Sequence, residues 1–215
     1  CVFGYTSNNE FILVLEKDIQ LTAVSWSNNC PAILDQLTKE CIALHDSATN
    51  LLNKYYFEGS DPAKLDLILD LLNLAINCDS NFFLAYNNKV TVLSTKGEYQ
   101  KVVKLLDEML VFSDNNPQLI CLKGIAYEKL NDNATAEALY KQAAVGYEKQ
   151  LKLYPDSLQL ITDKLFFTAF TKGKDEALSE LNNYILKYPD KSILKDFQPM
   201  FENFSRDDFM NQYRK

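Results

Sequence analysis

The fold of this chain is decided by residues 124–143, which read GIAYEKLNDNATAEALYKQA. Small residues stand at Gly124, Ala136 and Ala143, and tyrosines stand at Tyr127 and Tyr140. Small side chains at the contact between two helices allow their axes to come close together. The stretch therefore predicts two helices that pack tightly against each other.

The same spacing recurs along most of the chain. Three sets of aligned residues are separated by 34, 34 and 41 positions. They are Tyr56, Val90, Gly124 and Leu165; Ile68, Val102, Ala136 and Ala177; and Leu72, Leu106, Tyr140 and Leu181. The last interval has seven extra residues, which add two helical turns and keep the buried face in phase. We expect them to extend a helix from about Ala134 to Leu153.

A period of 34 residues with two helices per unit is typical of tetratricopeptide repeats. Residues 124–143 resemble the G-x-x-Y…A-x-x-x-F/Y-x-x-A pattern of that family, and Tyr188-Pro189 resembles its closing proline. The resemblance covers about residues 49–190. It implies an all-α fold, a right-handed α-solenoid of about four tetratricopeptide-like helix pairs with amino- and carboxy-terminal capping helices.

Three regions follow from this pattern. Residues 1–30 form an amino-terminal segment, residues 31–190 the helical repeats, and residues 191–215 the carboxy-terminal capping helices. Within the first region, residues 10–26 fit either a hairpin that turns at Lys17-Asp18 or a helix. An apolar stripe predicts one long helix from Pro31 to Phe57. The aromatic carboxy-terminal segment serves either capping, which we favour, or self-association, so the oligomeric state stays open.

Composition excludes several classes of protein. Of 215 residues, 47% are hydrophobic and 24% charged, which is a globular balance. The net charge of −7 disfavours a nucleic-acid partner. The longest apolar run near the start covers residues 11–15, far short of the roughly 20 residues that span a bilayer. We therefore expect no transmembrane segment.

The cysteines support two conflicting predictions about the compartment in which the protein is found. A first residue Cys1 resembles the mature start of a bacterial lipoprotein, which predicts a lipid anchor there and a place in the bacterial cell envelope, facing the periplasm. The alternative is a cytoplasmic protein. No C-x-x-C pair exists, and Cys30 and Cys41 would lie about 16 Å apart on a continuous helix. The thiols thus look like small buried hydrophobes, which weighs against an oxidising compartment.

Catalysis would have to use the single histidine, His45. With Cys41 it forms an i, i+4 pair that could supply two metal ligands, but no second ligand pair is nearby. We expect a packed cysteine beside a solvated histidine. No nucleophile elbow or glycine-rich phosphate loop is present. The sequence therefore predicts no enzyme activity, no cofactor and no metal.

The resemblance also implies a partner-binding groove formed mainly by the first helix of each pair. The matching positions carry no Lys or Arg, and they suit a neutral extended segment or an amphipathic helix. We therefore predict a non-catalytic scaffold or adaptor that binds a protein partner. The alternative is an immunity or inhibitor protein that neutralises a single toxic enzyme. The groove residues are Asn50, Asn53, Phe57, Leu84, Asn87, Thr91, Ser94, Gln118, Cys121, Ile125, Glu128, Gln159, Thr162 and Phe166.

Overall fold

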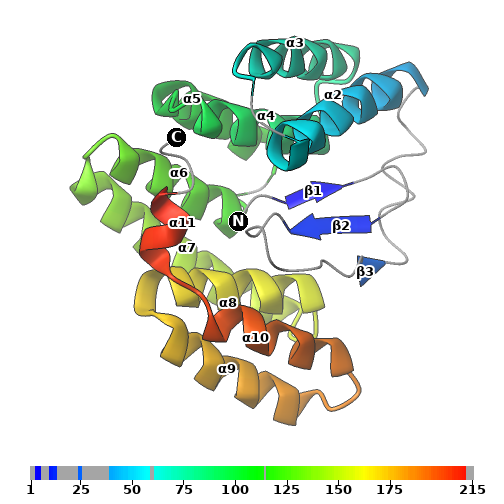
Figure 1. The fold of residues 1–215 in the computed structure, drawn as a ribbon. Coiled ribbons are helices and arrows are strands. Elements are labelled where there is room, and N and C mark those ends of the chain that lie inside the picture. The colour runs from blue at the N-terminus through cyan, green and yellow to red at the C-terminus, as the bar shows by residue number, and fades with distance from the viewer. Residues whose placement is uncertain are drawn as a thin grey trace. The chain divides into compact units, whose positions relative to one another are not determined.

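A computed structural model describes residues 3–5, 10–13, 24–25, 39–58, 61–113 and 115–211 (Figure 1). The chain divides into two compact units, Cys1–Glu98 and Tyr99–Lys215. The division falls inside the predicted repeat region, at the step from residue 98 to residue 99. Each unit is described by itself below.

The first unit opens with a three-stranded antiparallel sheet in the order β1-β2-β3. The strands are β1 (Phe3–Tyr5), β2 (Glu10–Leu13) and β3 (Val24–Ser25). Glu10 pairs with Ser25 and Phe11 with Val24, a register centred on Lys17-Asp18. Of the two structures considered for residues 10–26, the described pairing has the hairpin and not the helix.

Three helices complete the first unit: α2 (Lys39–Glu58), α3 (Ala63–Cys78) and α4 (Phe83–Thr95). The predicted start of the first helix at Pro31 lies outside the described residues. The apolar faces of the three helices meet in one core, since Ala48, Leu52, Leu72 and Ala85 are all almost completely buried. Each helix therefore covers the apolar stripe of its neighbour.

The second unit holds five further repeat helices, α5 (Tyr99–Phe112), α6 (Pro117–Lys129), α7 (Asn133–Leu153), α8 (Leu158–Lys172) and α9 (Lys174–Lys187). The starts of α4, α6 and α8 are 34 and 41 residues apart, and so are the starts of α5, α7 and α9. This confirms the predicted spacing from α4 onward and the two-turn extension of α7, whereas α2 and α4 start 44 residues apart and α3 and α5 start 36 residues apart. Of the twelve aligned positions, only Tyr56 and Tyr140 are half-buried, and the others are buried.

Helix starts in the second unit are set by local capping. The Asn116 side chain accepts a hydrogen bond from the Gln118 amide, with Pro117 at the first helical position of α6. Asp132 caps α7 and Ser157 caps α8 in the same way. These caps satisfy amide groups that the helix itself leaves without partners, so the helices begin at the predicted breaks.

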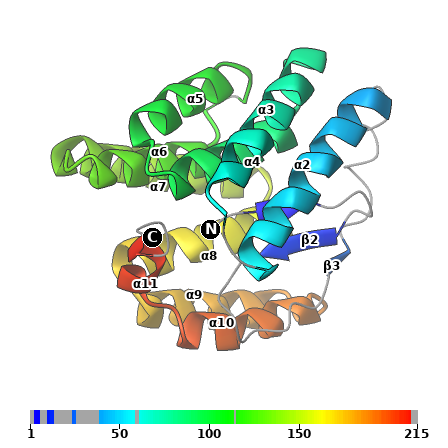
Figure 2. The ribbon, with the colours of Figure 1, turned by 45° about the horizontal axis from the view of Figure 1, so that its top comes forward.

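The carboxy-terminal segment consists of a 3₁₀-helix η1 (Ser192–Phe197), α10 (Gln198–Glu202) and α11 (Arg206–Asn211). Both η1 and α10 contact α9, and Figure 2 shows α10 running beside that helix. Leu194, Phe201 and Phe209 are its buried residues. The aromatic carboxy-terminal segment therefore packs its buried side chains within the second unit.

A disulfide joins Cys41, near the start of α2, to Cys78, the last residue of α3. The expectation that both are small buried hydrophobes is wrong, although Cys41 is buried and Cys121 is a free buried thiol as expected. The reason is topological. In an antiparallel helix pair, the start of one helix lies beside the end of the next, so these two residues meet with a Cα–Cα distance of 5.6 Å.

Gly124 is the point of closest approach between α6 and α7. A Cβ atom placed there would lie 2.5 Å from Cε1 and 2.8 Å from Cδ1 of the Tyr140 ring. That ring is held in place, because its hydroxyl donates to Glu128 and its edge meets the Phe170 ring. The small residue expected at this helix contact is therefore required.

We expect Gly124→Ala to lower the free energy of unfolding of the second unit by about 1–3 kcal/mol, the usual cost of overpacking. Urea denaturation followed by circular dichroism measures the loss. Gly97→Ala offers a contrast, because a Cβ at Gly97 meets nothing within 4 Å and only its φ of 72° strains the substitution. A Gly124→Ala protein as stable as wild type would contradict the close approach.

Candidate partner-binding surface

The predicted groove residues of the first unit differ in accessibility. Phe57 is 70% exposed and Asn50 is also exposed. Thr91 is only 3% exposed, and its hydroxyl donates to the Asn87 carbonyl, so it faces its own helix and not a partner. The half-buried residues are Asn53, Leu84, Asn87 and Ser94. Their role in binding stays a prediction.

In the second unit, three of the predicted groove residues are buried: Cys121, Thr162 and Phe166. The expectation that Phe166 offers an open apolar pocket is wrong, because the ring of Phe201 from α10 packs against it with ring centroids 4.9 Å apart. Gln118, Ile125, Glu128 and Gln159 are half-buried. The carboxy-terminal segment therefore covers part of the face that was expected to be free.

An ion pair holds α11 on this face. Nη2 of Arg206 donates to both carboxylate oxygens of Glu128, at 2.8 and 2.6 Å. Nε of Arg206 donates to the Phe170 carbonyl oxygen at 3.1 Å. Charge-assisted hydrogen bonds of this kind are among the stronger polar contacts in proteins. Arg206 thus joins α11 to both α6 and α8.

Aromatic contacts surround the ion pair. The Arg206 guanidinium lies 4.5 Å from the centre of the Phe170 ring, and the Phe209 ring packs against Phe170 in a T-shaped arrangement with centroids 5.5 Å apart. The Tyr140 hydroxyl donates to Glu128 at 2.8 Å. Burial, followed by the hydrogen bond to Glu128 and the negative charge of that carboxylate, raises the pKa of Tyr140, so this hydroxyl stays protonated and keeps donating.

We call this site the Glu128–Phe170 surface and define it by five residues of α6, α7 and α8: Glu128, Lys129, Tyr140, Phe166 and Phe170. The Lys129 ammonium adds a hydrogen bond to the Met210 carbonyl oxygen of α11. Sequence reasoning identified Glu128 and Phe166, but it missed their partners in the carboxy-terminal segment. The aromatic stripe before Phe209 was a signal for packing, whereas nothing around Arg206 indicated its partner.

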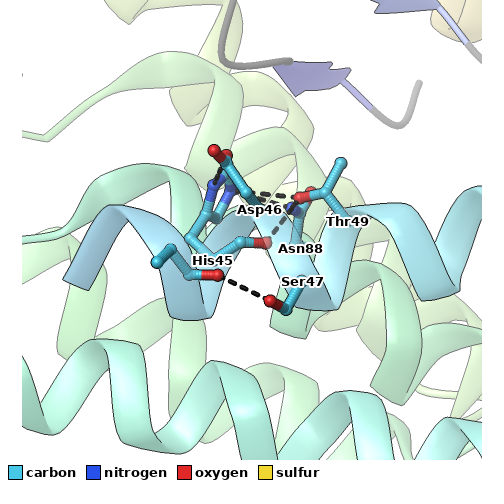
Figure 3. A network of polar contacts seen from close by, with 6 residues as sticks. His45, Asp46, Ser47, Thr49 and Asn88 are labelled. Carbon is cyan, nitrogen blue, oxygen red and sulfur yellow. Dashed lines mark hydrogen bonds and ion pairs between the residues drawn. The ribbon is translucent and has the colours of Figure 1, made fainter. Parts of the chain in front are cut away.

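His45 belongs to a buried polar network in the first unit (Figure 3). It is 3% exposed, so the expectation of a solvated histidine is wrong. The Asn88 amide nitrogen donates to Nε2 of His45 at 3.0 Å and to the Thr49 hydroxyl at 2.9 Å. Nε2 is then an acceptor, which places the proton on Nδ1, 3.5 Å from the Asp46 carboxylate.

The environment of His45 keeps the ring neutral. Burial lowers its pKa, and the nearby Asp46 carboxylate only partly opposes that effect. Phe82 lies against the ring, with centroids 5.0 Å apart. Because Cys41 is disulfide-bonded, the Cys41–His45 pair is used for structure. Within the described ranges, no group of three His, Cys, Asp or Glu side chains could hold a metal ion.

Asp163 is the buried acid of the second unit. It is 8% exposed, and both carboxylate oxygens accept from Nε2 of Gln159, at 2.8 and 2.9 Å. Burial raises its pKa to about 7, and the hydrogen bond from Gln159 opposes the rise. The negative charge of Asp163, added to burial, in turn raises the pKa of Tyr147 on α7. A carboxyl group therefore titrates inside the α7–α8 interface near neutral pH.

From α4 to α9 the helices form pairs whose starts repeat at intervals of 34 and then 41 residues. This arrangement is tetratricopeptide-like. Comparisons with protein-family models and with curated proteins find no match. Among solved structures, the chain is similar to YrrB, described as a TPR protein with an unusual peptide-binding site, at 19% identity and a TM-score of 0.40. The similarity covers 85% of this chain and 88% of that chain.

None of the helices in the described part of the chain has the length and apolar character needed to cross a membrane.

Proposed function

We propose that this chain is a non-catalytic protein-interaction module that binds a helical segment of a partner through α6 and α8. The observation that carries the proposal is the seating of α11 on the Glu128–Phe170 surface. A short helix is bound there through named side chains, in the manner of an amphipathic helix in a groove. A scaffold or adaptor role fits this mode of binding.

Two half-buried residues of α6 extend the proposed binding face. Ile125 stands about one turn before Glu128 on the same helix, and Gln118 stands about three turns before it. Ile125 supplies apolar surface, and the Gln118 amide can both donate to and accept from a partner backbone. Neither side chain carries a charge, so this part of the face suits the neutral flank of a bound helix.

The test compares partner capture by full-length variants. We expect the double variant Gln118→Ala/Ile125→Ala to retain a partner from native-host extract roughly tenfold less tightly, which corresponds to about 1.4 kcal/mol of binding free energy. The matched control is Glu137→Ala/Lys141→Ala, an exposed ion pair on α7. Quantitative mass spectrometry of captured and cross-linked proteins gives the readout. Equal capture by a folded Gln118→Ala/Ile125→Ala protein would overturn the proposal.

We further propose that the protein matures in an oxidising compartment such as the bacterial cell envelope. The support is the Cys41–Cys78 disulfide, since disulfides persist mainly outside the reducing cytosol. Lipid attachment at Cys1 stays a prediction, because Cys1 lies outside the described residues.

A further inference from the structure

We infer that α11 is a built-in competitor for the Glu128–Phe170 surface, and that the partner presents an arginine and an aromatic residue three positions apart on a helix. The inference rests on the proposed function and adds the partner's chemistry and its regulation. It follows from the contacts of Arg206 and Phe209, because those contacts indicate which side chains this surface binds.

The surface distinguishes arginine from lysine. Arg206 uses Nη2 for the Glu128 carboxylate, Nε for the Phe170 carbonyl oxygen, and its planar face for the Phe170 ring. A lysine ammonium can reach one of these groups but cannot serve all three at once, because it is a single compact charge on a flexible stem. The positive residue of the partner is therefore arginine.

The aromatic position is fixed relative to the arginine. Residues three apart lie on the same face of a helix, so Arg206 and Phe209 both contact the Phe170 ring from one short element. Phe209 is 9% exposed and is the one buried residue among those described in α11. A partner helix with the pattern Arg-x-x-Phe reproduces both contacts.

The size of α11 makes it displaceable. It has six residues, fewer than an isolated helix needs to be stable in water, so its helical form depends on the surface that it covers. By contrast, nine of the ten residues from Ile161 to Phe170 in α8 are buried. Segments with few buried contacts open locally at much lower free energy than the core. We therefore expect α11 to detach while α8 stays folded.

The test uses a labelled synthetic peptide with the sequence of residues 203–211, NFSRDDFMN, blocked at both ends. In the full chain, Arg206→Ala/Phe209→Ala removes the anchors of α11. We expect the peptide to bind this variant roughly tenfold more tightly than wild type, because α11 leaves the surface free in about a tenth of wild-type molecules and in nearly all molecules of the variant. Adding Glu128→Gln to the variant removes the gain. A peptide with Ala in both anchor positions binds neither protein.

Equal peptide binding to wild type and the anchor variant, or no binding to either, overturns the inference. Amide hydrogen exchange of wild type tests it without any substitution. We expect residues 206–211 to exchange by local opening, well before α8. Exchange of both segments in one common opening shows a purely structural cap and overturns the competitor role.

Two further outcomes separate this inference from the proposed function. Wild type that sediments as a dimer, with the anchor variant monomeric, shows that a second copy supplies α11 and overturns an intramolecular competitor. If α11 opens and the peptide binds, but Gln118→Ala/Ile125→Ala captures partner like wild type, the proposed face is wrong while the competitor stands. If Gln118→Ala/Ile125→Ala captures less partner but α11 stays closed, the proposed binding face stands and the competitor role is wrong.

Discussion

We expect replacement of Asp163 by Asn to raise the free energy of unfolding of the second unit by about 4 kcal/mol at pH 8 and by about 2 kcal/mol at pH 5.5. The cause is the burial of the carboxylate, which raises its pKa from 3.8 to about 7. Asparagine has the shape of the protonated acid and no charge to bury. The gain in the free energy of unfolding is thus largest at high pH, where the buried Asp163 carboxyl of wild type must ionise.

The sign of the pH dependence follows from proton binding. Between about pH 4 and pH 7, the folded chain keeps the proton on Asp163 while the unfolded chain releases it. Stability of wild type therefore falls through this window as pH rises, and the penalty is complete above pH 7. Below about pH 4 both states are protonated, and the variant offers no advantage.

Urea denaturation of wild type and Asp163→Asn across this pH range measures the effect. Subtracting the two curves removes the contributions of the groups that titrate alike in both proteins. Burial raises the pKa of the Cys121 thiol to about 12, and burial followed by the Asp163 charge raises the pKa of Tyr147, so both groups stay protonated throughout this range. Asp190→Asn is the matched control, because Asp190 is exposed. A stability difference that does not change with pH would show that Asp163 is ionised without penalty.

Loss of the Cys41–Cys78 disulfide lowers the free energy of unfolding of the first unit by about 4 kcal/mol. The two cysteines are 37 residues apart, and the chain-entropy model assigns about this value to a loop of that length. The bond ties the start of α2 to the end of α3. Reduction therefore enlarges the set of unfolded conformations while leaving the native helix contacts in place.

The measurement compares oxidised wild type, reduced wild type and the double variant Cys41→Ala/Cys78→Ala in urea. Reduced wild type and the variant should unfold at similar, lower concentrations, and reductant should not change the variant further. Thiol labelling under denaturing conditions, with and without prior reduction, shows directly whether Cys41 and Cys78 are disulfide-bonded. Labelling of both Cys41 and Cys78 in unreduced protein would disprove the disulfide.

The sequence alone predicted the features that depend on near neighbours in the chain. Helix starts depend on caps such as Asn116-Pro117 and on apolar stripes with the helical period, and both are local. The seven inserted residues could be assigned to α7 because two extra turns preserve the phase of its buried face. Gly124 was recognised as a close contact because its position within the repeat defines which helix it meets.

Contacts between distant residues could not be predicted in this way. Glu128 looks like a free groove residue in sequence, and only the return of α11, 78 positions later, shows that Arg206 occupies it. The same holds for His45 and Asn88, which are 43 positions apart.

The sequence by itself determined the period, the helix pairs and the faces that those helices bury, because periodic apolar residues and caps act over one or two turns. Only the tertiary structure decided that Cys41 reaches Cys78, that the His45 ring is buried and neutral, and that the carboxy-terminal segment covers the Glu128–Phe170 surface. Those outcomes depend on where chain segments far apart in sequence meet, and on the burial that the meeting produces.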